Sequence, residues 1–534
     1  MGLNDQQLKA ATSEAESILC LAGAGAGKTK TLLARIEHLT KKGVDPKSIL
    51  AITFTNAAAF EMKQRYKMLP GLDLSRGEPE FRTFHSFCYS LIIKDQKIRE
   101  RLGYTKVPEV CNDTYMKQLR ERIKLQLGCK LSDKELEPST VLISRSKQEQ
   151  RELFHKALKK TIKKENIITF DIMCYNVCAL FEKDDPCIQF YKQKYKYLFC
   201  DEFQDVDPKQ FKFIASFPKG THIYLCGDSL QCIYQFRNCS NEYIKVLSNT
   251  PGWEVIKLYK NYRSTTNICE FANKFSKYAD DRYRIAMEGQ RDGEDVVQIY
   301  GASSSYNSPV DEGHLRRLIK MLKEHTADCA VLCRTNKECN AVKAALTEED
   351  IEYSTSNKHS DSINLLNCAL DNDYMLGWLA SQLDTYDYGN YIRLSALQEN
   401  PDIRWFLKTY NHKTKIHDLA KKISKIREVS ISDNLPKDKL KEITKLLKLK
   451  TKFDPEEFPQ GNKSFLEYLR DKLQEVEETQ IYVGTIHSSK GLEYDSVYVM
   501  GVNDKSFQLG SEEMNNLYYV AITRAKNHLT IFRS

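Results

Sequence analysis

The chain has 534 residues, of which 41% are hydrophobic and 28% are charged, so it can bury the cores of three or four domains. No stretch reaches the roughly 18 consecutive apolar residues of a membrane span, and the start MGLNDQQL does not resemble a secretory signal. We therefore expect a cytoplasmic protein without membrane contact. The 80 Lys and Arg residues outnumber the 72 Asp and Glu residues, a mild excess that allows a nucleic-acid partner without demonstrating one.

The N-terminal part alternates strand and helix signals. Ile18–Leu21 is a short apolar run typical of a buried parallel strand, and a Gly-rich turn follows it. The next residues place Leu32, Leu33, Ile36 and Leu39 on one helical face. Further strand-like runs are Ile49–Phe54, Tyr197–Cys200, Ile223–Cys226, Ile481–Val483, Val497–Met500 and Leu529–Phe532. This alternation predicts an α/β fold with doubly wound parallel sheets.

Residues 22–29, AGAGAGKT, follow the P-loop pattern GxxxxGK[ST] except that Ala22 replaces the first glycine. Glycines allow successive backbone N–H groups to turn toward phosphate oxygens, and the following helix start adds positive potential. We expect Lys28 to reach the β- and γ-phosphates of ATP and Thr29 to hold Mg²⁺. The predicted nucleotide loop comprises Ala22, Gly23, Ala24, Gly25, Ala26, Gly27, Lys28 and Thr29.

The sequence YLFCDEFQD at 197–205 supplies the acids that such a loop needs. Asp201 ends an apolar run, where it can hold Mg²⁺, and Glu202 can then polarise the attacking water. An acidic pair alone is a weak signal, because such pairs are common at strand ends. Together with a P-loop in the same sheet it predicts ATP hydrolysis.

Two segments differ from the rest. Residues 90–165 and 357–479 are rich in charged residues at helical spacing and carry few strand signals. The second includes a Lys-rich stretch from Lys408 to Lys452, which is either a solvated helical face or a surface for nucleic acid or a partner. Leu419, Ile423, Ile426, Leu440, Ile443, Leu446 and Leu447 recur in it at amphipathic spacing.

None of the 16 cysteines forms a CxxC pair. Cys174, Cys178 and Cys187 are the nearest approach to a ligand cluster. Cys174 and Cys178 lie one helical turn apart, as core residues would, since free Cys behaves as a small hydrophobe. A metal or iron–sulfur site is the alternative.

The chain resembles the UvrD/Rep/PcrA helicases of superfamily 1 in motifs that occur in order from residue 3 to residue 526. These motifs are LNDQQ (3–7, the Q motif), ITFTNAAAFEMKQR (52–65, motif Ia), TFHS (83–86, motif Ib), DEFQD (201–205, motif II), CGDSLQCIYQFR (226–237, motif III), NYRS (261–264, motif IV), VGTIHSSKGLEYD (483–495, motif V) and YYVAITRAK (518–526, motif VI). The resemblance implies two RecA-like parallel-sheet P-loop domains, each interrupted by a mainly helical insert. The first domain would be 1–90 with 166–260 around insert 91–165, and the second 261–356 with 480–534 around insert 357–479.

The resemblance also implies roles at the nucleotide. Gln7 would read adenine and Gln231 would sense the γ-phosphate. Arg263 and Arg524 match the two arginine fingers, which contribute only when the two domains close on ATP; a surface salt bridge is the alternative for Arg524. Tyr262 matches the aromatic that stacks on adenine, and Glu493 matches an acid near the ribose.

On the nucleic-acid side, Tyr234 and Phe236 match aromatics that stack on bases, with core packing as the alternative for both. Short polar groups suited to phosphate and sugar contacts are Thr55, Asn56, Thr83, His85, Thr485 and His487. A structural role is the alternative for His85.

The chain departs from the family pattern in two places. Motif VI usually opens with a Glu-Glu pair and an Arg, whereas here Met514 follows Glu513 and Asn516 takes the Arg position. This puts one inter-domain or nucleotide contact in doubt, though not Arg524. Asn238 stands where the family often has Gly.

The resemblance implies an ATP-dependent DNA helicase or translocase, 3′-to-5′, acting on single-stranded DNA and single/double-strand junctions with ATP and Mg²⁺. The chain ends soon after motif VI, so we expect no fused nuclease and no C-terminal recruitment tail. Two alternatives remain open. One is a motor subunit that acts with a partner nuclease docked on the second insert, in a DNA repair complex or Gabija-like phage (antiviral) defence. The other is a nucleoprotein remodeller that does not unwind.

Overall fold

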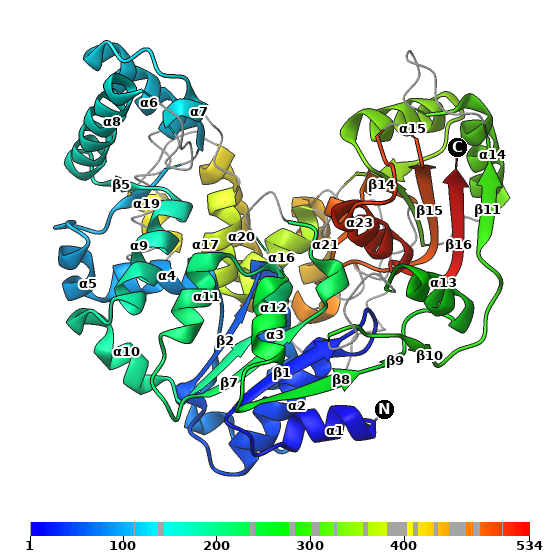
Figure 1. The fold of residues 1–534 in the computed structure, drawn as a ribbon, viewed down its shortest axis with the longest axis horizontal. Helices are drawn as coiled ribbons and strands as arrows, with labels where there is room; N and C mark the ends of the chain where they lie inside the picture. Colours follow the sequence, from blue (N-terminus) through cyan, green and yellow to red (C-terminus); the bar gives the residue numbers. More distant parts are fainter. Residues whose placement is uncertain are drawn as a thin grey trace. The chain divides into compact units, whose positions relative to one another are not determined.

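A computed structural model describes residues 2–111, 113–136, 144–234, 239, 241–276, 283–301, 310–324, 328–355, 361–381, 403–409, 415–431, 436–447, 466–470, 473, 481–504 and 506–533. The chain divides into two compact units (Figure 1). The first unit comprises Met1–Arg82, Tyr191–Ile363 and Tyr468–Ser534, and the second comprises Thr83–Phe190 and Asn364–Glu467.

The first unit contains a six-stranded sheet in the order β3-β2-β6-β7-β1-β8. Its strands are β1 (Ser17–Ala22), β2 (Ile49–Thr53), β3 (Glu80–Thr83), β6 (Tyr197–Cys200), β7 (His222–Gly227) and β8 (Trp253–Leu258). The β1–β7, β1–β8, β2–β6 and β6–β7 pairs are parallel. The predicted N-terminal strands are therefore confirmed. Because parallel strands end at one edge, the loops after β1, β6 and β7 lie together.

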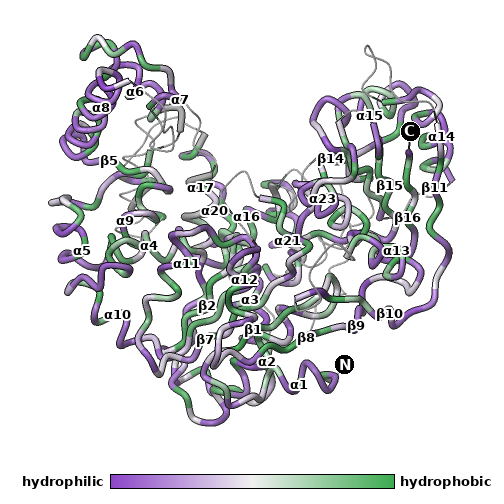
Figure 2. Tube along the Cα trace, viewed as in Figure 1, coloured by the Kyte–Doolittle hydropathy of each residue, from purple (hydrophilic) through white to green (hydrophobic). Residues whose placement is uncertain are grey.

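A second six-stranded sheet in the same unit has the order β11-β16-β15-β12-β14-β13, with parallel pairing throughout. Its strands are β11 (Val297–Tyr300), β12 (Cys329–Cys333), β13 (Tyr353–Ser354), β14 (Ile481–Thr485), β15 (Tyr494–Val502) and β16 (Ala525–Arg533). The three C-terminal strand predictions correspond to β14, β15 and β16. Strands β1 and β2 are hydrophobic over most of their length (Figure 2), and they and β12 are almost entirely buried, as strands covered on both faces should be.

Helices pack along these sheets. They are α1 (Asp5–Thr12), α2 (Lys28–Lys41), α3 (Asn56–Lys67), α11 (Pro208–Ala215), α12 (Glu242–Ser248), α13 (Thr266–Ser276), α14 (Glu312–Glu324), α15 (Asn336–Glu348) and α23 (Glu512–Ile522); η1 (Pro46–Ser48), η2 (Leu74–Arg76) and the pair β9 (Lys260–Asn261) and β10 (Glu288–Gly289) complete the framework. The predicted apolar face of α2 is buried at Leu32, Leu33, Ile36 and Leu39.

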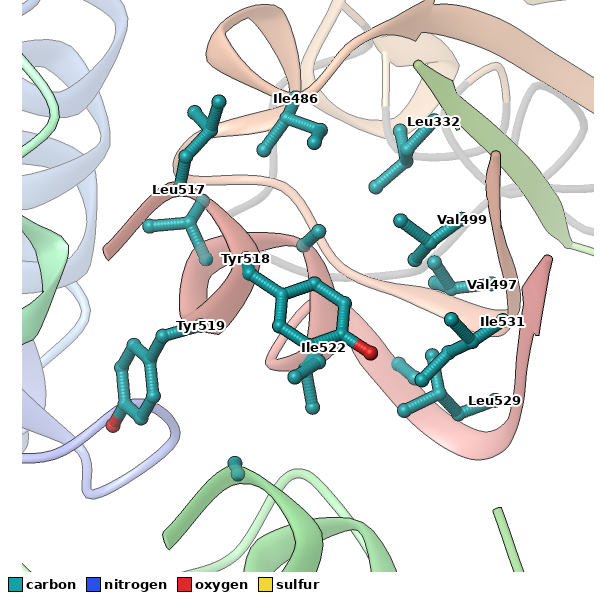
Figure 3. Packing of buried hydrophobic residues seen from close by; sticks show 14 of the residues in the cluster. Leu332, Ile486, Val497, Val499, Leu517, Tyr518, Tyr519, Ile522, Leu529 and Ile531 are labelled. Carbon is teal, nitrogen blue, oxygen red and sulfur yellow. The ribbon is translucent and has the colours of Figure 1, made fainter. Parts of the chain in front are cut away.

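The packing of α23 shows how the second sheet is covered. Leu517, Tyr518 and Ile522 of this helix share a buried cluster with Val497 and Leu529 of the sheet (Figure 3). The ring of Tyr518 meets that of Phe275 edge-on, with centroids 4.7 Å apart. Edge-to-face contacts of this kind add to the area that the rings bury.

The second unit is mainly helical. Its helices are α4 (Phe84–Lys94), α5 (Gln96–Arg101), α6 (Asp113–Leu127), α7 (Asp133–Leu136), α8 (Arg145–Lys164), α9 (Phe170–Glu182), η3 (Pro186–Ile188), α17 (Asn372–Ser381), α19 (Ile403–Thr409), α20 (Lys415–Ile431) and α21 (Pro436–Leu447); α10 (Gln189–Lys194) and α16 (Asp361–Leu370) cross the unit boundaries, and β4 (Glu109–Val110) pairs with β5 (Ile167–Ile168). No helix in the described ranges has both the length and the apolar character of a membrane span.

The helices α20 and α21 are amphipathic, as the spacing of their apolar residues predicted. Ile423, Ile426, Leu440, Ile443 and Leu447 are buried, whereas Leu419 and Leu446 are only partly buried. The outcome is a small helical core with a Lys-rich exterior.

Cys174 and Cys178 lie one turn apart on α9 and are buried, with their sulfur atoms 4.0 Å apart. The third thiol of this group is Cys88 of α4, 3.9 Å from Cys174, and not Cys187. Burial raises the pKa of the Cys88 thiol well above its usual value, so the neutral thiol is favoured. The three buried sulfur atoms lie within 4.8 Å of one another, so the geometry fits core packing of Cys174 and Cys178 and equally fits the alternative of a metal site.

Candidate nucleotide and nucleic-acid sites

Three carbonyl groups of the loop between β1 and α2 accept hydrogen bonds from residues outside the loop. The carbonyl of Ala24 accepts from Asn261 Nδ2 at 2.8 Å, that of Gly25 from the Tyr262 N–H at 3.0 Å, and that of Ala26 from Gln7 Nε2 at 3.0 Å. The C=O and N–H of a peptide unit point in opposite directions. Anchoring these carbonyls outward therefore turns the N–H groups of Gly25 and Gly27 toward the inside of the loop, as a phosphate cradle requires.

Glycine is needed at two positions of this loop. Gly25 and Gly27 have φ of +67° and +76°, where a side chain is strained. A Cβ at Gly25 would also lie 2.7 Å from Asn261 Oδ1. Ala22 ends β1 and is buried, as are Gly23, Ala24 and Ala26, so alanine at the first motif position fits the strand end.

Lys28 begins α2 and faces the acids that follow the neighbouring strands. Burial alone would lower the pKa of Lys28, but the carboxylates of Glu202, Asp228 and Asp201 outweigh it and raise that pKa. A cation held here by carboxylates is the counter-charge that a triphosphate would meet.

Thr29 and Asp201 lie together, as the prediction of a shared metal ion requires. Thr29 Oγ1 donates to Asp201 Oδ2 at 3.0 Å. Burial, with the adjacent charge of Glu202, raises the pKa of Asp201 to about 7. Burial disfavours the charged form of this carboxylate, and a divalent cation would offset that cost. A carboxylate beside a hydroxyl also offers the oxygen ligands that a hard cation such as Mg²⁺ takes.

Glu202 adopts φ of 53°, a left-handed conformation that is uncommon for a residue with a side chain. Gln204 Nε2 donates to Glu202 Oε2 at 2.5 Å, and Gln204 Oε1 accepts from the Asp228 N–H at 2.9 Å. Burial would raise the pKa of Glu202, but Lys28 and Lys490 outweigh it and lower that pKa. The side chain is therefore an oriented carboxylate, suited to accept a proton from water.

Gln231 ends η5 (Ser229–Gln231), directly after β7. Its Nε2 donates to Asp228 Oδ2 at 2.8 Å, and both side chains are buried. The Tyr519 hydroxyl of α23 reaches the same Asp228 oxygen at 3.4 Å. The loop after β7 thus contacts both Gln204 of the DEFQD segment and the motif VI helix.

The two arginines lie on the side of the second sheet. Arg263 Nε donates to Glu493 Oε2 at 2.5 Å and Arg263 Nη1 to the Thr523 carbonyl at 3.2 Å. Arg524 is buried and donates to the carbonyls of Val520 and Leu492 at 3.0 and 2.9 Å, and burial lowers its pKa to about 9. The guanidinium groups are thus held by Glu493 and by backbone carbonyls.

A group of three side chains lies beside the nucleotide loop: those of Gln7, Asn4 and Tyr262. Asn4 caps α1 in a capping box with Gln7, and Asn4 Nδ2 donates to the Tyr262 hydroxyl at 2.7 Å. Tyr262 is 37% exposed, which leaves this residue accessible for stacking.

The predicted nucleic-acid residues of motifs III and V meet in the first unit. The ring centroids of Tyr234 and His487 are 6.3 Å apart. Lys490 Nζ lies 4.8 Å from the Tyr234 ring centroid, donates to the Gln231 carbonyl at 2.8 Å and pairs with Asp205. Thr485 Oγ1 donates to Ser488 Oγ at 3.1 Å at the start of η8 (His487–Ser489).

The other nucleic-acid predictions lie at helix starts. Thr55 caps α3, whose first residue is the exposed Asn56. In the second unit Thr83 caps α4, and His85 contacts the ring of Phe170 edge-on and pairs with Asp171 at 3.7 Å. Phe236 lies outside the described residues, so its stacking role stays a prediction.

Residues with a clear part in this geometry that were not predicted include Asn4, Gln204, Asp205, Asp228, Asn261 and Lys490. All stand inside motifs quoted from the sequence, at LNDQQ, DEFQD, CGDSLQ, NYRS and SSKGLE. Their motif membership was the available signal. Their contacts join segments far apart in the chain, which spacing along the sequence does not reveal.

The departures in motif VI also have structural counterparts. Asn516 is buried and its Nδ2 donates to the Cys232 carbonyl at 3.1 Å, a contact between α23 and the segment after η5. Glu513 lies 3.9 Å from Arg334. A neutral amide at position 516 therefore joins the motif VI helix to motif III.

A glycine-rich phosphate loop, a Thr–Asp pair and a strand-end glutamate at the edge of a parallel sheet define a P-loop nucleoside triphosphatase. Two protein-family models that match the chain identify its family within this class. The UvrD/REP helicase N-terminal domain matches residues 3–251, and the UvrD-like helicase C-terminal domain matches 256–360 and 392–534. The chain belongs to this family of ATP-dependent DNA helicases.

Several known proteins align with nearly the whole of this chain. A probable DNA helicase II homolog of Mycoplasma capricolum is 26% identical over 99% of this chain and 83% of that protein. The ATP-dependent DNA helicase PcrA of Bacillus subtilis is 25% identical over 99% of this chain and 82% of that protein. The putative ATP-dependent DNA helicase YjcD of the same organism is 26% identical over 99% and 78%.

Proposed function

We propose that the chain couples ATP hydrolysis to 3′-to-5′ movement along single-stranded DNA. The observation that carries the proposal is the position of Lys490. It binds Asp205 and the carbonyl of Gln231 on the nucleotide side and lies against the ring of Tyr234 on the nucleic-acid side. A change at the γ-phosphate end of the site can therefore reach a base-stacking ring through one side chain.

In this proposal the nucleotide site works through this chain's own groups. The loop N–H groups and Lys28 bind phosphate, Glu202 accepts the proton of the attacking water, and Gln231 reports the γ-phosphate. Arg263 and Arg524 contribute positive charge when their contacts with Glu493 and with backbone carbonyls are exchanged for phosphate. The adenosine would be held by Gln7, Tyr262 and Glu493.

Thr29 and Asp201 would hold Mg²⁺, which neutralises charge on the phosphates when bound. The 3.0 Å contact between them supports this assignment, because a hydroxyl and a carboxylate are oxygen ligands that Mg²⁺ accepts.

DNA would be held by stacking and by polar contacts to its backbone. Tyr234 and Phe236 would stack on bases, a contact worth about 1–3 kcal/mol per base that is tolerant of sequence. Thr55, Asn56, Thr83, His85, Thr485 and His487 would contact phosphate and sugar. The helical character of the second unit's described residues supports the assignment of segments 91–165 and 357–479 as inserts.

The direction of movement is supported by family membership. Action through a partner nuclease, in DNA repair or phage defence, and remodelling without unwinding are the alternatives. If the chain acts through a partner nuclease, the Lys-rich exterior of α20 and α21 is the surface that we assign to that partner.

Strand displacement by the isolated chain on a partial duplex with a 3′ single-stranded tail tests the proposal. We expect ATP-dependent unwinding that a 5′ tail does not support. ATP turnover stimulated by single strands without any displacement would favour the two alternatives. Co-purification with a nuclease would then separate them.

A further inference from the structure

The hydroxyl of Tyr262 is held by the N-terminal helix. Asn4 Nδ2 lies 2.7 Å from this hydroxyl, 258 residues away in the sequence. The backbone on either side is also fixed. The Tyr262 N–H donates to Gly25 in the phosphate loop, and the preceding Asn261 is buried and donates to Ala24. Hydrogen bonds therefore hold both the backbone of Tyr262 and the hydroxyl at the far end of its ring.

The orientation of the Asn4 amide follows from its partners. Asn4 Oδ1 accepts from the Gln7 N–H at 2.9 Å, which satisfies a free donor in the first turn of α1. With the oxygen engaged, the NH₂ group must face the tyrosine, so Asn4 donates and the hydroxyl accepts. The Asn4 amide thus has two uses: its oxygen caps the start of α1, and its NH₂ group holds the hydroxyl of Tyr262.

The same helix start carries Gln7. Its Oε1 accepts from the Asn4 N–H at 3.1 Å, and its Nε2 donates to the Ala26 carbonyl at 3.0 Å. Asn4 thus lies between the side chain that anchors α1 to the phosphate loop and the exposed ring beside that loop. A change in its side chain alters how Gln7 and Tyr262 are placed relative to one another.

We propose that Asn4 is a positioning residue for the base of the nucleotide, and that it holds the ring of Tyr262 in the orientation that stacks on a purine. This inference rests on the proposed role of Tyr262 at the nucleotide base. A partly exposed tyrosine without this bond would lose rotational freedom each time a nucleotide binds. Ordering the ring in advance removes that cost and tightens nucleotide binding.

Asn4→Ser separates the two uses of the side chain. Serine is a good N-cap, so α1 keeps its first-turn hydrogen bond, but its short side chain cannot also reach the hydroxyl. We expect KM for ATP to rise about two- to tenfold, the range that an unheld side chain costs, with a smaller change in kcat. Tyr262→Phe removes the other partner and keeps the ring, so it should raise KM by a similar factor.

The double variant Asn4→Ser/Tyr262→Phe should be no worse than either single variant, because both remove one bond. The matched control is Thr335→Ser, which changes the cap of a similar capping box on α15 without altering Asn4 or Tyr262. Its KM should match that of the parent chain.

The outcomes separate the two levels of the argument. Unchanged KM in both single variants, or additive effects in the double variant, overturns the positioning role. Tyr262→Ala tests stacking itself. If it raises KM while Asn4→Ser and Tyr262→Phe do not, only the positioning role fails; if Tyr262→Ala also leaves KM unchanged, the proposed nucleotide role of Tyr262 fails.

Discussion

At the residue scale, the nucleotide site concentrates charge that burial makes costly. Asp201 and Asp228 are buried and Lys28 and Glu202 are partly buried, and these four groups shift one another's pKa. Such groups are stable only when opposite charges offset their loss of water. Perturbed carboxylates cluster at catalytic sites, which supports the hydrolytic role that we propose for this group.

Glu202→Gln should separate nucleotide binding from turnover. The amide can keep the contact with Gln204 but cannot accept a proton, so we expect ATP hydrolysis to fall about 100-fold or more while ATP still binds. The measurement is single-strand-stimulated hydrolysis beside equilibrium nucleotide binding. Glu242→Gln, at an exposed carboxylate paired with Lys245, is the control. Near-parent turnover in Glu202→Gln would remove this residue from the mechanism.

Lys490→Met should lower stability as well as coupling. The pair Lys490–Asp205 is almost fully buried, with side-chain exposures of 9% and 1%. Removing one partner leaves a buried charge, which costs about 3–5 kcal/mol. We expect a lower thermal midpoint for Lys490→Met and partial recovery in Lys490→Met/Asp205→Asn, because the second change removes the unpaired carboxylate. A double variant less stable than the single one would contradict this account.

At the element scale, the strands and the P-loop helix were predictable because their signals are local. The apolar face of α2 and the runs that became β1, β6 and β7 appear directly in the sequence. The left-handed backbone of Glu202 and the outward anchoring of Ala24 by Asn261 were not predictable in this way. They depend on neighbours that only the folded sheet brings together.

The packing of α23 offers a test with a matched pair of variants. Tyr518 is fully buried among the rings of Phe271, Phe275 and Phe507, and its hydroxyl has no hydrogen-bond partner among the described residues. Tyr518→Ala should destabilise the first unit by about 3–5 kcal/mol, as other buried aromatic truncations do.

Tyr518→Phe should be neutral or slightly stabilising, because it removes an unsatisfied buried hydroxyl and keeps the ring. Thermal unfolding of both variants is the measurement. Equal destabilisation by Phe and Ala would show that the hydroxyl has a partner after all, and that its contribution exceeds that of the ring contacts.

At the scale of the whole molecule, two parallel sheets in one unit supply both the phosphate loop and the arginines, and a helical unit carries Thr83 and His85. The chain carries a mild excess of 80 basic over 72 acidic residues. Its affinity for single strands should therefore depend on local phosphate contacts rather than on overall charge.

Those contacts predict a salt dependence. If about three phosphates are neutralised, affinity for oligo-dT should fall about tenfold or more between about 50 and about 200 mM salt, because binding releases condensed cations. Fluorescence anisotropy with labelled oligo-dT measures this directly. An affinity that is indifferent to salt would mean that base stacking alone holds the strand.

The central claim is that hydrolysis drives directional movement, and arrival times at a strand end test it most directly. The measurement is stopped-flow fluorescence on oligo-dT strands of increasing length, labelled at the 5′ or the 3′ end, after ATP is added to bound protein. We predict a lag that grows with length for the 5′ label and no such lag for the 3′ label, and loss of the lag in Glu202→Gln. A lag that does not depend on length, or one that grows only for the 3′ label, would contradict the account.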